Sequence, residues 1–109
     1  MSTKEFCKQS RLTPRKVQWW CETGVLRCSQ RERGFRDFDE AELRVAALVA
    51  QLRRKGVALT RIRQMRIRNP QGDFLVANGA AYWWCTREEL LPELAKTRGA
   101  CVVVSLKGL

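Results

Sequence analysis

The first part of the chain has the apolar spacing of two short helices. A first helix is expected over residues 4–9, with Thr3 as its N-cap. A second opens with Thr13 and Pro14, a capping hydroxyl followed by proline at the first helical position, and runs to about Thr23. Two short helices joined by a tight turn predict a helix-turn-helix.

The second helix is expected to have two faces of different character. At helical spacing, Val17, Trp20 and Gly24 fall on one face, which we expect to pack inward. Polar, charged and aromatic residues share the opposite face, which we expect to be exposed. They are Arg15, Gln18, Trp19 and Glu22.

A polar, basic, glycine-bearing segment follows over residues 27–36 and is expected to form a short hairpin, or wing. Asp39 is expected to cap a third helix, whose apolar stripe continues as far as Gly56 and whose acidic first turn suits the helix dipole. A short fourth helix is expected over residues 59–68. Residues 1–68 are therefore predicted to form a winged helix-turn-helix of four short helices and a wing.

A breaker cluster, Asn-Pro-Gln-Gly at residues 69–72, marks the expected boundary between two domains. Beyond it the spacing of apolar residues changes from helical to strand-like. Residues 74–77 and 80–84, on either side of the turn dipeptide at 78–79, predict a β-hairpin.

The rest of the chain is expected to add a helix and a strand. Thr86 and Glu89 have the spacing of a capping box, which opens a helix running to about Arg98. The β-branched, apolar residues 100–106 predict a buried strand. Residues 69–109 are thus predicted to form a ββαβ unit, which makes the whole chain an α+β protein. The helix side chains expected to face inward are Leu90, Leu91 and Leu94.

Basic charge is concentrated in the first of these predicted domains. The formal net charge is +10 at pH 7, and residues 1–68 hold 17 Lys and Arg against 7 Asp and Glu. Residues 69–109 hold 4 of each kind and are neutral. This asymmetry favours an anionic partner for the first domain, with a plain solvated basic face as the alternative. An anionic membrane surface is disfavoured, because no long amphipathic basic helix is free to lie on one.

The residue types needed for catalysis or for a metal site are scarce. The chain has five cysteines and no histidine, no Cys-x-x-Cys pair, and no carboxylates paired in a clear acid–base constellation. We therefore predict no enzyme, no metal site and no cofactor. The cysteines are expected to be mainly reduced, small apolar residues, with a thiol sensor formed by Cys21 and Cys28 as the alternative.

Several segments of residues 1–68 share their order and spacing with one known family. They are Phe6-Cys7, residues 12–20, Gly24-Val25-Leu26, residues 34–38, and residues 52–59 with Ile62. Together these segments resemble the MerR family of bacterial regulators, over more than half of the chain.

The resemblance implies that the second helix enters the major groove of DNA and that the wing lies beside the backbone. Arginine pairs with guanine edges and glutamine with adenine, which suits Arg15 and Gln18, whereas Lys16 suits a phosphate. Trp20 is expected in the core, and Trp19 at the DNA backbone or packed on the wing. The cations of the wing and of the third helix are expected to contact phosphates. The alternative is that they are solvated surface charges without a DNA contact. The residues expected to contact DNA are Thr13, Arg15, Lys16, Gln18, Trp19, Arg33, Arg36, Arg53, Arg54 and Lys55.

The chain also departs from the family's pattern. The family usually has arginine at the position of Gln18, an acidic residue at that of Cys21 and a serine-like cap at that of Ala58. Its long dimerisation helix and its effector-binding domain cannot be recognised in residues 69–109. We expect this tail to act instead as a homodimerisation module, or else to pack on the first domain and complete its core. No small-molecule effector can be named.

These features predict a small bacterial transcription regulator that binds double-stranded DNA sequence-selectively as a homodimer. The alternatives are an excisionase-like architectural protein that bends DNA, and a MerR-like adaptor that binds another protein. The start of the chain lacks the apolar stretch of a signal peptide, and no apolar run approaches the roughly 20 residues that span a bilayer. The protein is therefore expected in the cytoplasm, associated with the nucleoid and without a membrane partner.

Overall fold

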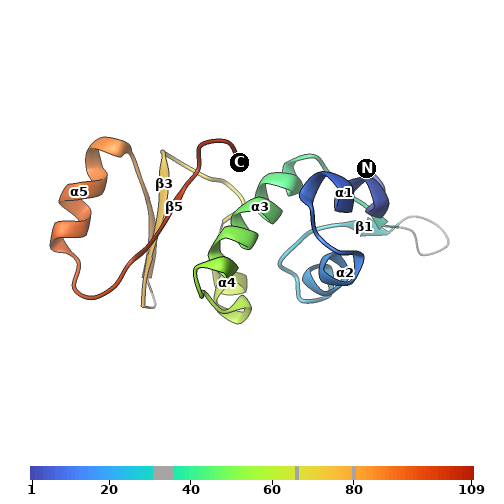
Figure 1. The fold of residues 1–109 in the computed structure, drawn as a ribbon, viewed down its shortest axis with the longest axis horizontal. Coiled ribbons are helices and arrows are strands. Elements are labelled where there is room, and N and C mark those ends of the chain that lie inside the picture. Colours follow the sequence, from blue (N-terminus) through green and yellow to red (C-terminus); the bar gives the residue numbers. More distant parts are fainter. Residues whose placement is uncertain (31–35, 66, 80) are drawn as a thin grey trace.

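The computed structural model describes residues 1–30, 36–65, 67–79 and 81–109. The molecule is elongated, with extents of 52, 24 and 19 Å along its principal axes. The described ranges form five helices, a small hairpin and a three-stranded sheet. Figure 1 shows α1 to α4 and the hairpin toward one end, the three-stranded sheet beyond them and α5 at the other end. This arrangement confirms the predicted α+β class.

The helices α1 (Thr3–Ser10) and α2 (Pro14–Glu22) form the predicted helix-turn-helix. The N-cap of α1 is Ser2, not Thr3 as predicted, and its hydroxyl oxygen accepts a bond from the backbone N–H of Glu5 at 3.2 Å. The reason is conformational: Ser2 has the extended backbone from which a capping hydroxyl reaches the first turn, whereas Thr3 is already helical.

The start of α2 is fixed by the predicted capping signals. The hydroxyl oxygen of Thr13 accepts a bond from the backbone N–H of Lys16 at 3.2 Å. Pro14 occupies the first helical position, where its missing N–H costs nothing. The turn before it is made by Arg11, which ends α1 in the left-handed conformation with φ of 60°. Local chemistry therefore sets where α2 begins.

The wing is a two-stranded antiparallel hairpin, in which β1 (Ser29–Gln30) pairs with β2 (Arg36–Asp37). Its predicted tip, residues 31–35, lies outside the described residues. Phe38 directly follows β2 and stacks on Phe6 of α1, with ring centroids 4.3 Å apart. This aromatic pair anchors the wing to the first helix.

The wing leads into α3 (Ala41–Arg54), and α4 (Leu59–Gln64) completes the four-helix unit. Asp39, the predicted N-cap of α3, does not cap it. The cap position is Glu40, and no side chain bonds the start of the helix from there. Asp39 contributes its backbone carbonyl instead, which accepts a bond from the N–H of Glu42 at 3.0 Å.

A partly buried ion pair joins segments of this part of the molecule that are far apart in the sequence. Glu42 is 6% exposed, and one of its carboxylate oxygens binds the guanidinium of Arg68. The other oxygen accepts a bond from the backbone N–H of Arg27 at 2.9 Å, and Arg68 donates to the carbonyl of Val25 at 3.0 Å. The predicted interaction of Glu42 with the helix dipole is therefore a minor part of its role. Its carboxylate instead joins α3 to two segments that are distant in the sequence.

The same contacts explain why α4 ends at Gln64 and not at Arg68 as predicted. Met65 adopts an extended backbone, with φ of −81° and ψ of 145°. Met65 and Ile67 are then buried, 7% and 4% exposed, and Arg68 turns back to Glu42. Continued helix would have carried these side chains away from the core.

The sheet is antiparallel throughout, with β3 (Phe74–Asn78) between β4 (Ala81–Cys85) and β5 (Val102–Ser105). The predicted hairpin at residues 78–79 is confirmed, since β3 and β4 meet there and Gly79 has φ of 52°. One face of the sheet turns toward α3 and the other toward α5 (Arg87–Lys96) (Figure 1). The residues of the α3-facing side are Leu75, Ala77, Tyr82, Trp84, Val102 and Val104.

One hydrophobic core runs from the helix-turn-helix into the sheet. Leu52 of α3 and Leu75 of β3 are both 0% exposed and belong to the same buried cluster, as do Val104 and Leu106 at the end of the chain. The tail therefore packs on the first part, which is the second of the two roles expected for it. Dimerisation by the tail, and a domain boundary near residues 69–72, stay predictions.

Helix α5 covers the outer face of the sheet less completely than predicted. Leu90 and Leu94 are half-buried, but Leu91 is 75% exposed, which corrects its predicted inward orientation. Leu90 and Leu94 lie one turn apart on the same face, and Leu91 is rotated by about 100° from Leu90. Among the described residues, no helix is long and apolar enough to cross a bilayer.

Candidate nucleic-acid interface

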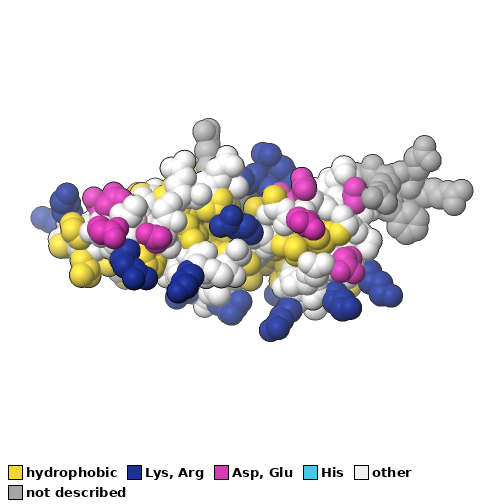
Figure 2. All heavy atoms as spheres, turned by 90° about the horizontal axis from the view of Figure 1, so that it is seen from above, with side chains coloured by type: hydrophobic (Ala, Val, Ile, Leu, Met, Phe, Trp, Pro, Cys, Tyr) yellow, Lys and Arg dark blue, Asp and Glu magenta, His cyan; other side chains and the backbone are white. Residues whose placement is uncertain are grey.

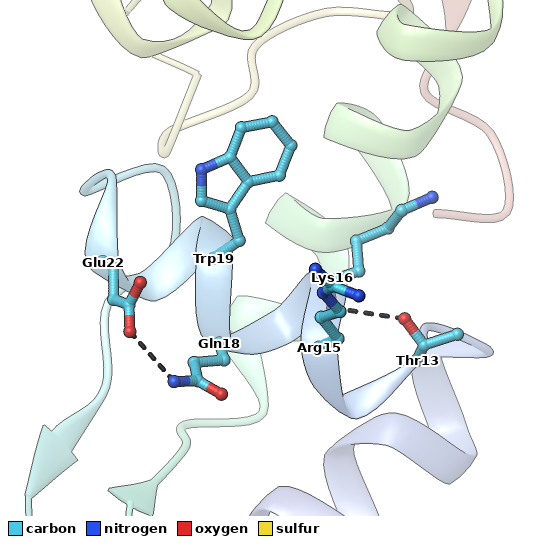
Figure 3. Close-up of a pocket in the computed structure, with 6 residues that line it drawn as sticks. All are labelled: Thr13, Arg15, Lys16, Gln18, Trp19 and Glu22. Carbon is cyan, nitrogen blue, oxygen red and sulfur yellow. Dashed lines mark hydrogen bonds between the residues drawn. The ribbon is translucent and has the colours of Figure 1, made fainter.

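The outer face of α2 carries an open, shallow hollow on the surface of the molecule (Figure 3). The orientation of this face is fixed by the core, because Val17 and Trp20 on the opposite side of the helix are 0% and 2% exposed. This burial confirms the predicted inward orientation of Val17 and the core position of Trp20. Gly24, predicted on the same face, is exposed, because α2 ends at Glu22 and the chain turns away there. The residues that line the hollow are Thr13, Arg15, Lys16, Gln18, Trp19 and Glu22. Five of these six are predicted DNA-contacting residues.

Gln18 and Glu22 lie together within the hollow, one helical turn apart. The amide nitrogen of Gln18 donates to a carboxylate oxygen of Glu22 at 3.0 Å (Figure 3). This bond orients the Gln18 amide, which keeps its second N–H and its carbonyl oxygen for another partner. The bond is absent from our sequence prediction, although the i, i+4 spacing on a helix was a usable signal for it.

Trp19 projects from α2 away from the Gln18–Glu22 pair (Figure 3). It is 51% exposed and, with Leu91, is one of two large apolar side chains that the described residues leave exposed. Its flat ring is thus free on one side to pack against a partner, and the predicted contact with a DNA backbone stays a prediction.

A second hollow adjoins the first and carries further positive charge. It is lined by Lys16, Trp20, Ala50, Arg53 and Arg54, so that Lys16 belongs to both hollows. The ammonium of Lys16 lies 6.0 Å from the Trp20 ring centroid, and a guanidinium nitrogen of Arg53 donates to the carbonyl of Val57 at 3.2 Å. The structure therefore places the cations at the end of α3 beside the start of α2.

The remaining predicted cations lie at other places. Lys55 is exposed at the C-cap of α3, directly after Arg54. Arg36 is half-buried on β2, where its positive charge reaches Cys21 at the far end of α2. Arg33 lies outside the described residues.

The opposite end of the molecule differs in character. Figure 2 shows acidic, basic and apolar side chains side by side at the α5 end, in keeping with the neutral charge of residues 69–109. Within the described ranges, no three His, Cys, Asp or Glu side chains come together in a group that could hold a metal ion.

Comparison with known proteins assigns the first part of the chain to a recognised sequence family. Residues 1–66 match the family model described as MerR HTH family regulatory protein. The match covers more than half of the chain and includes the helix-turn-helix, the wing, α3 and α4. No curated protein and no solved structure matches the chain. All ten residues predicted to contact DNA fall inside the matched segment.

Proposed function

The chain belongs to the MerR HTH family of DNA-binding transcription regulators, and from that premise we propose that it binds double-stranded DNA sequence-selectively as a homodimer. The observation that carries this proposal is the outer face of α2. It combines a base-reading set, Arg15 and Gln18, with a firmly buried inner face that fixes the helix on the protein.

In the proposed complex α2 lies in the major groove. Arg15 pairs with the O6 and N7 acceptors of a guanine. Gln18 uses its carbonyl oxygen and its second N–H to read an adenine, while its first N–H stays on Glu22. The bond to Glu22 lowers the entropy that the Gln18 side chain loses on binding, because its orientation is already set.

Phosphate contacts fix the position of α2 in the groove. Lys16, Arg53 and Arg54 surround one hollow next to α2 and suit consecutive phosphates of one strand. Arg36 on β2 suits the backbone on the other side of α2. Trp19, half exposed at the rim of the groove, packs on the sugar–phosphate backbone.

Residues 69–109 supply the proposed dimer contact. A single short recognition helix reads few base pairs, so a dimer that matches two half-sites raises both affinity and specificity. Two features support the tail as the interface: Leu91 on α5 is 75% exposed, and β4 and β5 are both edges of the sheet.

The shape of the molecule sets the half-site spacing for such a dimer. Helices α2 and α5 lie toward opposite ends of a molecule 52 Å long (Figure 1). Joining two copies at α5 would put the recognition helices farther apart than the ~34 Å of one turn of B-DNA. Half-sites more than one turn apart would therefore indicate an α5 interface, and adjacent half-sites a side-by-side dimer.

An architectural role in DNA bending is the second candidate. One observation favours it: the longest helix of the described residues is α3, with 14 residues, so this part of the molecule has no long dimerisation helix. Footprinting separates the two roles. Tandem direct repeats favour the architectural protein, whereas an inverted repeat at a promoter favours the regulator.

The DNA-binding proposal is tested by measuring the dissociation constant of the purified protein for duplex DNA across a range of salt concentrations. Release of counterions from ~6 phosphates gives a log–log slope near −5. Lys16→Ala is expected to reduce the slope by about 1. Lys96→Ala serves as the control and is expected to leave the slope unchanged, because Lys96 is an exposed cation on α5, at the opposite end of the molecule from α2 (Figure 1). A flat salt response of the wild-type protein contradicts the proposal.

A further inference from the structure

We propose that Cys21 and Cys28 form a reversible oxidation site, in which a peroxide converts the two thiols into an intramolecular disulfide. Cys21 lies in the last turn of α2, and Cys28 lies directly before β1. The site therefore bridges the two elements that the proposed DNA complex uses together, the recognition helix and the wing.

The two thiols lie close together in the reduced protein. Both are half-buried at the edge of the same hydrophobic core, near enough for Cys28 to act on the ionisation of Cys21. The intervening backbone explains how they meet. It folds back over the end of α2, where the N–H groups of Val25 and Leu26 both bond to the carbonyl of Trp20, at 2.9 and 3.0 Å. The conformational entropy of closing this short loop has thus been lost before any bond forms.

The other cysteines lie on separate elements. Cys7 is on α1, Cys101 precedes β5, and Cys85 at the end of β4 is 3% exposed. Cys21 and Cys28 have the arrangement that disulfide formation requires. Once one thiol is oxidised, the other must reach its sulfur without unfolding of the protein.

The surroundings assign different roles to the two sulfurs. Burial, together with the neighbouring thiol of Cys28, raises the pKa of Cys21 to about 12, although the charge of Arg36 opposes the shift. Cys21 consequently keeps its proton at neutral pH and acts as the resolving thiol. The first attack is assigned to Cys28.

The chemistry balances with one peroxide molecule. In the first step the Cys28 sulfur, having lost its proton, attacks a peroxide oxygen; an S–O bond forms, the O–O bond breaks, and the departing hydroxide takes up a proton as water. In the second step the Cys21 sulfur attacks the Cys28 sulfur; the S–S bond forms, the S–O bond breaks, and the hydroxide leaves with the Cys21 proton as water. Two thiols lose two electrons, and hydrogen peroxide becomes two molecules of water.

The expected consequence for DNA rests on the proposed function. An S–S bond of about 2.05 Å is shorter than any non-bonded contact between two thiols, so oxidation pulls the start of the wing against the end of α2. Arg36 on the wing and the outer face of α2 must meet the same duplex. A shift of one relative to the other is expected to cost about tenfold in affinity, comparable to the loss of contact at one base pair.

Peptide mapping tests the disulfide directly. Trypsin cleaves after Lys16, Arg27 and Arg31, so that Cys21 falls in peptide 17–27 and Cys28 in peptide 28–31. After treatment with hydrogen peroxide and alkylation of the remaining thiols, we expect these two peptides to be linked, and dithiothreitol to separate them. Over-oxidation of Cys28 without the link, or links to other cysteines instead, overturns the proposal.

Two serine variants sharpen the test. Cys28→Ser removes the link and the response of DNA binding to peroxide. Cys101→Ser, the matched control, retains both. Should Cys28→Ser fail to fold, Cys21→Ser gives the same reading, because it removes the resolving thiol and is expected to leave Cys28 as a sulfenic acid that dimedone traps.

The DNA measurement is kept separate, so that its outcome is distinguishable from failure of the proposed function. Reduced wild-type protein is expected to bind about tenfold more tightly than oxidised protein. Equal affinities, with the linked peptides present, overturn the regulatory role and leave the oxidation site standing. Absence of binding by the reduced protein contradicts the proposed DNA function, while peptide mapping still decides the disulfide.

Discussion

Gln18 and Lys16, two positions apart on α2, illustrate how different contacts arise from one short helix. Gln18 is held by Glu22 through a bond of 3.0 Å and has a planar amide that can distinguish one base edge from another. Lys16 has a compact point charge and lines one hollow together with Arg53 and Arg54 at the end of α3. The first suits sequence recognition, and the second suits the attraction of any phosphate backbone.

This difference predicts opposite effects of two alanine substitutions on specificity. Gln18→Ala is expected to reduce discrimination at a single base pair by about 1–3 kcal/mol, because one bidentate contact is lost. Lys16→Ala is expected to weaken all sequences alike. Binding-site selection from a random library, followed by dissociation constants for single-base variants of the selected site, measures both effects. A uniform loss of affinity for Gln18→Ala would show that this residue does not read a base.

At the scale of the element, α5 shows how a few polar bonds start a helix that has no fully buried residue. The N–H of Thr86 donates to a carboxylate oxygen of Glu89 at 3.1 Å, and the Thr86 hydroxyl donates to the same oxygen at 2.7 Å. These bonds favour the ionised carboxylate and so lower the pKa of Glu89. The predicted capping box is thereby confirmed.

The lowered pKa of Glu89 predicts a specific dependence of stability on pH. Because the folded pKa lies below that of an unfolded glutamate, about 4.3, the contribution is fully present above that value. It is lost as the pH falls through the lower folded pKa. Glu89→Gln is expected to remove this pH-dependent part of the free energy of unfolding, which urea unfolding curves at several acidic pH values measure. Glu88→Gln, also in the first turn, is the control and should retain it.

At the scale of the whole molecule, one core joins segments that the sequence divides. Leu52 on α3 and Leu75 on β3 are 0% exposed in the same cluster, and β5 returns the end of the chain to α3. Shared burial of this kind favours cooperative unfolding, because neither part can open without exposing apolar surface of the other.

Cooperative unfolding is tested by two substitutions on opposite sides of the predicted boundary. Leu52→Ala and Leu75→Ala are each expected to cost about 2–5 kcal/mol of unfolding free energy. Both should lower one and the same thermal transition in differential scanning calorimetry, with equal calorimetric and van't Hoff enthalpies. Two transitions, each shifted by a different variant, would show instead that residues 1–68 and 69–109 unfold as separate domains.

The sequence by itself determined the features that depend on neighbours within about four residues. The start of α2 at Thr13 and Pro14, its inner face with Val17 and Trp20, the hairpin at residues 78–79 and the capping box at Thr86 all appear as predicted. Each rests on backbone bonds or on periodicity, which are local properties. The grouping of Thr13, Arg15, Lys16, Gln18 and Trp19 follows from the same helical geometry.

The tertiary structure decided what depends on residues far apart in the chain. The early end of α4, the pairing of Glu42 with Arg68, the exposure of Leu91 and the position of Arg53 beside Lys16 could not be read from the sequence. For these residues local propensity is weak, and the outcome is set by which partner satisfies a buried charge or covers an apolar surface. The closeness of Cys21 and Cys28 lies between the two cases. The sequence suggested that they could act as a pair, and the backbone folded over the end of α2 brings them near each other.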